Sequence, residues 1–318
     1  MGDPAGIGPE ICVKALTGSN VNTYCTPVIV GELRTLTTTA RLLNINATFQ
    51  EIDDFGGGAD ITVLHVATEE EFQVGIDTAG SGRAAASYIE TAVDLWRRGE
   101  IDAIATAPIS KKALSLAGYE FPGHTEFLAH LTGTERVGMS FFGGELRVVL
   151  LSTHLALNEA IKLVTKTNLI ELIKFSDKEL NRLLGRRPKL AVAGLNPHAS
   201  ENGMFGREEI DEIVPAVAES KNAGIDVSGP YSPDTIFLRC YRGEFDAVIA
   251  LYHDQATIPV KAFSFGSAVN VTLGLPLIRT SVDHGTAFDI VGKGVADASS
   301  MVSAIKLAAE LVTRQKER

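Results

Sequence analysis

Short apolar runs alternate along the chain with segments of helical periodicity. The runs rich in β-branched residues predict strands at 27–30, 61–66, 103–106, 147–151, 190–193 and 247–251. Between them, apolar residues recur three and four positions apart, which is the spacing of one helix face. Alternating strands and helices are typical of βαβ units around a mostly parallel sheet, so we expect an α/β fold.

Three helical segments stand out from this pattern. The clearest apolar stripe covers 89–96, and Gly99 is placed to end that helix. A second stripe lies in 208–222, with apolar residues at 210, 213, 214 and 217, and Pro215 predicts either a kink or a later start. A last helix is predicted at 299–315.

Two segments carry the signals of a helix start. In MGDPAGIGPE the glycines predict a tight turn, Pro9 stands at a first helical position, and Glu10 suits the positive end of the helix dipole. Asn168 and Glu171 have the three-residue spacing of a capping pair. The chain opens on the first of these turns, without the strand that we expect to precede it.

Length, charge and cysteine content narrow the class of protein. The 318 residues suit two average domains, and the net charge of −10 argues against nucleic acid or an anionic membrane as a partner. The three cysteines are too few and too scattered for a disulfide framework or a CxxC metal site. No secretory signal and no apolar run of membrane-spanning length are visible, so we expect a cytoplasmic protein.

Histidines follow three of the predicted strands. His154 comes after RVVLLST, His198 after KLAVAGLNP and His253 after DAVIALY. In an open α/β sheet, ligands bind beyond the carboxyl ends of the strands. Three neutral imidazoles suit zinc, cobalt, iron or manganese and leave coordination positions open for substrate oxygens. Spacing alone does not prove convergence, so three separate, hydrogen-bonded structural histidines are the alternative.

Other polar residues suggest an anion site. His124 and Thr125 form a donor pair at the glycine turn of PGHTEF. Lys261 lies between apolar neighbours and Arg279 follows TLGLPLI, so we expect both to be partly buried beside a phosphate or carboxylate. Asn270, between two valines, is either a substrate hydrogen-bonder or a strand residue that faces water.

The glycine pattern does not indicate a standard Rossmann nucleotide site. GDPAGIGPE differs in spacing from GxGxxG, and no complete strand precedes it. The later stretch DHGTAFDIVGKGVAD, at 283–297, is polar and glycine-rich, so its backbone amides could approach a nucleotide closely. Its alternative interpretation is a turn before the final helix.

Taken together, these motifs resemble one enzyme family. MGDPAGIGPE, PGHTEFLA, LNPHASENG, YHDQ and GLPLIRTSVDHGTAFDI are similar to the 4-hydroxythreonine-4-phosphate dehydrogenase family of vitamin B6 biosynthesis, from Met1 to the final helix. The resemblance implies a two-domain fold like that of isocitrate and isopropylmalate dehydrogenases, with a cleft between the domains, and a homodimer whose active site is shared between subunits. We place the first domain at 1–115 and 270–318, and the second, with the metal ligands and dimer interface, at 116–269.

The resemblance also implies roles for individual residues. The ligands of one divalent metal (Zn, Co, Mn or Mg), one of them from the partner subunit, would be His154, His198 and His253. Substrate-binding positions would be His124, Thr125, Lys261, Asn270 and Arg279, with Lys261 and His124 as candidate catalytic residues. Looser matches to nucleotide contacts are His284, Gly285, Thr286 and Asp289.

The implied reaction is an NAD- or NADP-dependent oxidative decarboxylation of 4-phosphohydroxy-L-threonine to 3-amino-2-oxopropyl phosphate. The metal would acidify the substrate hydroxyl and stabilise the enolate, while Lys261 would assist proton transfer or pair with the anionic substrate. Alternatives with the same chemistry are D-threonate 4-phosphate, D-erythronate 4-phosphate and a cyclic dihydrodiol dicarboxylate. Alternatives of other classes are a phosphate acyltransferase, which shares a similar fold, and a non-catalytic metal- or metabolite-binding protein.

Overall fold

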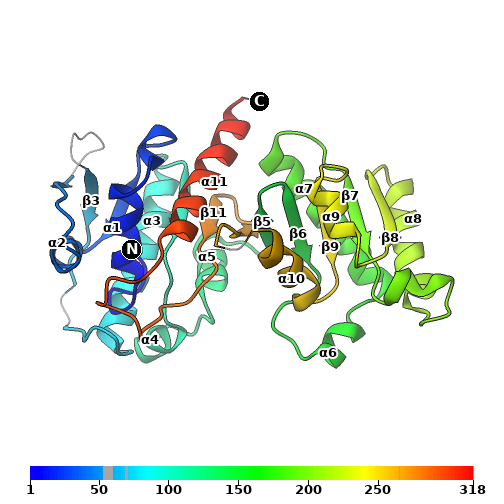
Figure 1. Ribbon diagram of the computed structural model, residues 1–318, viewed down its shortest axis with the longest axis horizontal. Helices are drawn as coiled ribbons and strands as arrows, with labels where there is room; N and C mark the ends of the chain where they lie inside the picture. The colour runs from blue at the N-terminus through cyan, green and yellow to red at the C-terminus, as the bar shows by residue number, and fades with distance from the viewer. Residues whose placement is uncertain (53–59, 69–70, 265, 318) are drawn as a thin grey trace. The chain divides into compact units, whose positions relative to one another are not determined.

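The protein is an α/β protein whose chain divides into two compact units. The computed structural model describes residues 1–52, 60–68, 71–264 and 266–317 (Figure 1). Unit 1 contains Met1–Arg136 and Leu275–Val312, and unit 2 contains Val137–Gly274 and Thr313–Arg318. Among the described residues, no helix combines the length and the apolar character needed to span a bilayer.

The limits of the units follow from packing. Helix α5 (His124–Thr132) packs against α3 (Ala79–Arg97), so unit 1 extends beyond residue 115. Strand β10 (Val269–Leu273) pairs with β5 (Gly138–Gly143), so unit 2 extends beyond residue 269. The boundaries therefore lie near 136 and 274 rather than at the expected positions of 115 and 270.

Unit 1 contains two groups of parallel strands. A three-stranded sheet has the order β1-β3-β2, formed by β1 (Val28–Gly31), β3 (Ile61–His65) and β2 (Phe49–Glu51). Separately, β4 (Ala103–Thr106) pairs in parallel with β11 (Ile278–Ser281). The other elements of unit 1, besides α3 and α5, are α1 (Gly8–Thr17), η1 (Val21–Thr23), α2 (Leu33–Leu42), α4 (Lys111–Leu116) and α11 (Ser299–Lys316). The residues of α11 from Thr313 onward belong to unit 2. One apolar cluster, including Ile11, Leu36 and Val63, packs α1 and α2 on the three-stranded sheet.

Unit 2 is built on a mixed sheet in which the central strands are parallel. The order is β10-β5-β6-β9-β7-β8, with β6 (Leu146–Leu150), β9 (Ala247–Ala250), β7 (Leu190–Ala193) and β8 (Val227–Tyr231). Strand β6 is parallel to β9, and β9 to β7, so their carboxyl ends meet at one edge. The helical elements are α6 (Leu157–Lys162), α7 (Lys166–Leu184), η2 (Pro197–Glu201), η3 (Glu209–Ile213), α8 (Val214–Asn222), α9 (Ile236–Tyr241) and α10 (His253–Phe263).

Most sequence-based element predictions are confirmed. All six predicted strands are present with ends shifted by at most one residue, and Pro9 and Glu10 lie in the first turn of α1. Pro215 likewise lies in the first turn of α8, which is the later start that it predicted. The capping prediction is wrong, because Thr165 is the N-cap of α7 and its hydroxyl accepts a hydrogen bond from the Asn168 amide at 3.3 Å.

The predicted apolar stripe of 208–222 is only half buried. Ile213 and Val217 are buried, whereas Ile210 is 40% exposed and Val214 is 47% exposed. The reason is that η3 is a π-helical turn, in which the wider spacing of hydrogen-bonded residues rotates side chains away from the face expected for an α-helix.

Candidate active site

Two of the three strand-end histidines meet in unit 2. His154 follows β6 and His253 opens α10 after β9, and their ring centroids are 5.6 Å apart with an interplanar angle of 43°. Metal–nitrogen bonds of about 2.0–2.1 Å place two imidazoles on one zinc ion with ring centres roughly 4.5–5.5 Å apart. His154 is exposed and His253 is 39% exposed, so the pair is accessible, and its spacing of 5.6 Å lies just beyond the range for two ligands of one zinc ion.

Asp254 orients one of these rings. Nδ1 of His253 lies 2.7 Å from Oδ1 of Asp254. Because a carboxylate accepts hydrogen bonds, this contact favours the tautomer in which Nδ1 carries the proton and Nε2 keeps its lone pair. Metal-binding histidines are commonly held in this way by a carboxylate on the other ring nitrogen.

Buried polar side chains tie the ends of β6, β9 and β7 together. The Ser152 hydroxyl donates to the Leu251 carbonyl at 2.9 Å. Gln255 accepts from the Leu251 amide at 2.7 Å and donates from Nε2 to the Gly194 carbonyl at 2.7 Å. These bonds explain why polar residues directly follow a buried strand: they fix the loops that carry the histidines.

His198 lies in an unusual turn after β7. Its φ is +54°, and the next four residues are also left-handed, namely Ala199, Ser200, Glu201 and Asn202. Left-handed backbone costs roughly 1–2 kcal/mol for each L-residue with a side chain. The surrounding structure must therefore hold this turn, which keeps the His198 side chain exposed.

The described residues of a single chain do not form a complete metal centre. In the part of the chain that the structure describes, no three His, Cys, Asp or Glu side chains come together in a group that could hold a metal. The described geometry thus joins His154 with His253, but not His198 with that pair. A ligand from a partner subunit stays a prediction.

A buried arginine marks the candidate anion site of unit 1. Arg279, in β11, is 4% exposed and donates from Nε and Nη2 to the Thr106 hydroxyl at 3.2 and 2.8 Å. Burial lowers the pKa of Arg279 to about 10, against the opposing effect of Glu126, so the guanidinium remains charged at neutral pH.

His124 and Thr125 open α5 in the same unit. Burial, followed by the positive charge of Arg279, lowers the pKa of His124 well below its usual value of 6.5. His124 is therefore a neutral imidazole at neutral pH, which is able to donate one hydrogen bond and accept another.

The other two predicted substrate-binding residues belong to unit 2. Lys261 is exposed on α10, so the expected partial burial is wrong for this residue. On a helix, adjacent side chains point in different directions, and here Val260 enters the core while Lys261 does not. Asn270 is half-buried in β10, opposite Phe141 of β5.

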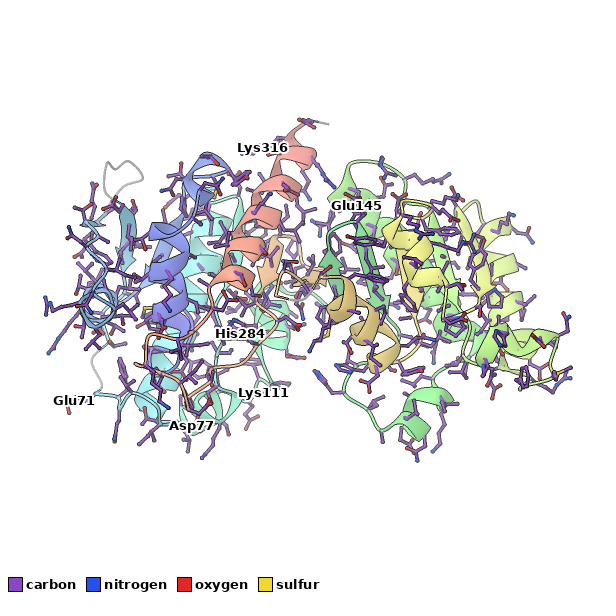
Figure 2. The ribbon with its side chains drawn as sticks, viewed as in Figure 1. Glu71, Asp77, Lys111, Glu145, His284 and Lys316 are labelled. Carbon is purple, nitrogen blue, oxygen red and sulfur yellow. The ribbon has the colours of Figure 1, made fainter. Side chains whose placement is uncertain are left out.

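Two glycine-rich loops of unit 1, at residues 2–8 and 283–297, pack directly on each other. The Ile7 amide donates to the Thr286 carbonyl at 3.0 Å. A Cβ atom at Gly6 would lie 2.9 Å from Cβ of Thr286, so this approach requires glycine. His284 is exposed on the connection between β11 and α11 (Figure 2), and Gly285 and Asp289 are exposed as well.

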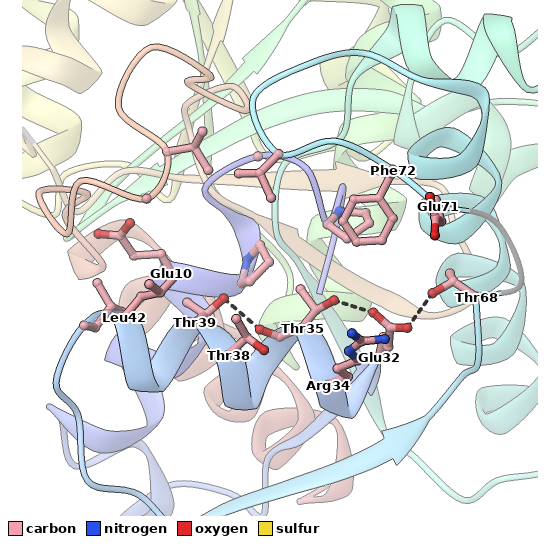
Figure 3. Close-up of a pocket in the computed structure, with 17 residues that line it drawn as sticks. Glu10, Glu32, Arg34, Thr35, Thr38, Thr39, Leu42, Thr68, Glu71 and Phe72 are labelled. Carbon is pink, nitrogen blue, oxygen red and sulfur yellow. Dashed lines mark hydrogen bonds between the residues drawn. The ribbon is translucent and has the colours of Figure 1, made fainter.

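A cavity of about 570 Å³ lies beside these loops in unit 1 (Figure 3). Its lining includes Gly6 and Gly292 from the two loops, and Glu32 and Thr35 from the start of α2. Glu32 accepts hydrogen bonds from Thr35 and from Thr68, the latter at 2.8 Å. Sequence reasoning missed Glu32, although its position just after a predicted strand was a usable signal.

Known proteins resemble the chain over nearly its whole length. Residues 23–308 match the family model of the pyridoxal phosphate biosynthetic protein PdxA. A 4-hydroxythreonine-4-phosphate dehydrogenase of Desulforapulum autotrophicum is 45% identical over 97% of this chain and 93% of the relative. A D-threonate 4-phosphate dehydrogenase of Cupriavidus necator is 44% identical over 99% of this chain and 96% of the relative. The crystal structure of a 4-hydroxythreonine-4-phosphate dehydrogenase from Klebsiella pneumoniae is 42% identical, with a TM-score of 0.89 over 98% of both chains.

Proposed function

Because the chain belongs to the family of the pyridoxal phosphate biosynthetic protein PdxA, we propose that it is a metal-dependent, NAD(P)-linked dehydrogenase. Its substrate would be 4-phosphohydroxy-L-threonine, which is oxidised and decarboxylated to 3-amino-2-oxopropyl phosphate. The observation that carries the metal-dependent part is the His154–His253 pair, with ring centroids 5.6 Å apart and Asp254 on the far nitrogen of His253.

The histidines would hold one divalent cation, with His198 as the third ligand. When bound, a divalent metal makes a coordinated hydroxyl more acidic and stabilises negative charge that develops on oxygen. Asp254 would keep the Nε2 lone pair of His253 directed outward, and Gln255 would keep the loops after β9 and β7 in register.

Arg279 and His124 would bind the anionic groups of the substrate. A buried guanidinium is little hydrated, so a phosphate or carboxylate gains a strong charge-assisted hydrogen bond there. Neutral His124 and the Thr125 hydroxyl, at the start of α5, add donors without a second positive charge. From unit 2, Asn270 would add a hydrogen bond, and exposed Lys261 would pair with the substrate or move a proton.

The nucleotide would bind at the paired glycine loops of unit 1. The nicotinamide of NAD or NADP, when bound, accepts the hydride. His284, Gly285, Thr286 and Asp289 would contact the cofactor, supported by the close packing of Gly6 on Thr286 and by the cavity beside it.

A second copy of the chain would complete the site. Exposed large apolar side chains flank two of the histidines: Leu155, Leu157 and Ile161 follow His154, and Met204 and Phe205 follow His198. Exposed apolar side chains of this kind mark protein interfaces when they lie together. A homodimer would cover them and would bring a histidine of the partner to the pair. The three cysteines are free, which suits a reducing cytoplasm.

A second candidate substrate is D-threonate 4-phosphate, because relatives that carry that name are as similar as the others, at 44% against 45% identity. Turnover of both compounds, followed by the absorbance of the reduced cofactor, distinguishes them. A protein that reduces neither NAD nor NADP with either substrate, but transfers an acyl group between phosphate and coenzyme A, would contradict the proposal.

The metal assignment has its own test. His198→Ala should abolish turnover and remove bound metal while the protein stays folded, whereas His130→Ala, at an exposed position on α5, serves as the control. Retention of the metal and normal turnover in His198→Ala would rule out the ligand role of His198.

A further inference from the structure

A carboxylate is buried beneath the left-handed turn that carries His198. Glu209, the first residue of η3, is 1% exposed. Its Oε1 atom accepts hydrogen bonds from the backbone amides of Leu195 and Asn196, both at 2.7 Å. Its Oε2 atom accepts from Nδ2 of Asn196 at 2.9 Å. Nδ2 of Asn196 also donates to Oε2 of Glu208 at 2.7 Å. The buried carboxylate of Glu209 is a fixed anchor, because the two backbone amides would otherwise stay unpaired.

The bonds of Glu209 act on the residues at which the turn begins. The Ala199 amide donates to the Asn196 carbonyl at 3.1 Å, so the position of Asn196 sets the start of the left-handed run. Further along, the Ser200 carbonyl accepts from the Gly203 and Phe205 amides. Several left-handed residues in a row persist only where the surroundings over-determine them, and Glu209 supplies that constraint at the first end.

The same segment is held from the other side by the helix of His253. Gln255, two residues after His253, donates to the Gly194 carbonyl at 2.7 Å, and the next amide, that of Leu195, donates to Glu209. A Cβ atom at Gly194 would lie 3.2 Å from Oε1 of Glu209, so the carboxylate also fits closely against this glycine. One short segment thus links α10 to the turn of His198.

We propose that Glu209 is a positioning residue for the metal site: it holds the left-handed turn in the one conformation that presents His198 as a ligand. The inference rests on the proposed function of His198. Glu209 acts through backbone amides and through Asn196, and it does not touch the metal or the substrate. The placement of this carboxylate in a π-helical turn suits such a role, since π-turns recur at functional sites.

Glu209→Gln is the sharpest variant, because it keeps the shape and removes the charge. One oxygen still accepts from the two backbone amides, but the new NH₂ group meets the Asn196 NH₂ group, which is also a donor. We expect the affinity for Co²⁺, measured by visible absorption of the full-length protein, to fall about 10- to 100-fold. Hydrogen exchange of the Leu195 and Asn196 amides should become faster in the same variant.

Glu179→Gln is the matched control. Glu179 is also a buried carboxylate of unit 2, on α7, and it pairs with Arg182. This variant should keep wild-type Co²⁺ affinity even if its unfolding midpoint falls as far as that of Glu209→Gln. Should Glu209→Gln not fold, Asn196→Ala retains both backbone hydrogen bonds to Glu209 and should weaken Co²⁺ binding by about 3-fold.

The outcomes separate this inference from the proposed function. If His198→Ala loses Co²⁺ affinity while Glu209→Gln and Asn196→Ala keep it, the positioning role of Glu209 is overturned and the metal site stands. An equal loss in Glu179→Gln would also overturn it, because general destabilisation would then explain the effect. If His198→Ala itself keeps wild-type Co²⁺ affinity, the proposed ligand set fails, and the role of Glu209 fails with it.

Discussion

Nδ1 of His253 lies 2.7 Å from Oδ1 of the adjacent Asp254, at the first turn of α10. This carboxylate fixes which ring nitrogen carries the proton and makes the other nitrogen a more basic ligand. Asp254→Asn keeps the size of the side chain but loses the charge. We expect it to weaken Co²⁺ binding by about 10-fold and to lower turnover at subsaturating metal.

The control for Asp254 is Asp234→Asn, an exposed carboxylate that accepts a hydrogen bond from Ser232. Its Co²⁺ titration should match that of the unmodified protein. Equal affinities for Asp254→Asn and the unmodified protein would show that the carboxylate does not tune the ligand.

Gln255→Leu should destabilise the protein through two backbone groups. The side chain is buried and serves both the Leu251 amide and the Gly194 carbonyl. Leucine has a similar volume, so the main cost is that these two groups lose their partners, at about 1–3 kcal/mol each. Urea unfolding should therefore show a loss of about 2–6 kcal/mol in the free energy of unfolding.

Gln73→Leu, at an exposed position, provides the comparison for that experiment. It should change the free energy of unfolding by less than about 0.5 kcal/mol. A loss of similar size in both variants would mean that the hydrogen bonds of Gln255 contribute nothing specific.

The placement of the histidines after strands could be predicted, but their convergence could not. Apolar, β-branched runs marked the strands that precede His154, His198 and His253. These three strands are neighbours in the order β6-β9-β7. That order depends on pairing between segments that lie far apart in the sequence, and the periodicity of one segment carries no information on its partner. Only the structure shows that His154 and His253 meet.

Buried charges were the harder part of the site. Glu209 belongs to the run REEIDE, which looks like the solvated face of a helix, yet its carboxylate is buried under the loop of residues 194–196. The left-handed turn at His198 contains no glycine until Gly203, so the strongest signal for such backbone is missing from its first five residues. For Lys261 the error was the opposite one: burial was predicted and the side chain is exposed. Apolar neighbours in the sequence do not bury a side chain on a helix, because adjacent side chains point in different directions.

Gly6→Ala tests the packing of the two glycine loops. The added methyl group would lie 2.9 Å from Cβ of Thr286 and 3.0 Å from its carbonyl oxygen, so the loops must separate. If they hold the nucleotide, we expect NADH affinity, measured by fluorescence, to fall at least about 10-fold, together with a cost of about 1–3 kcal/mol in stability.

The same methyl group at Gly285 meets no atom within 4 Å. Gly285→Ala should therefore keep the stability of the unmodified protein, and a loss of NADH affinity in it would locate the nucleotide against that loop. Undiminished NADH binding in both variants would place the cofactor elsewhere.

His124 should make the stability of the protein depend on pH below 6.5. Burial and the charge of Arg279 lower the pKa of His124 in the folded state, so the unfolded chain binds the proton more readily. The stabilising contribution is complete above the usual value of 6.5 and is lost as the pH falls toward the folded-state pKa. His124→Asn removes this contribution, so its free energy of unfolding should fall less steeply below pH 6.5 than that of the unmodified protein.

The NMR resonance of the His124 ring, assigned by its disappearance in the variant, should titrate below 6.5. A resonance that titrates at or above that value would mean that His124 enters the anion site as a cation, which would contradict the neutral donor role derived from its burial.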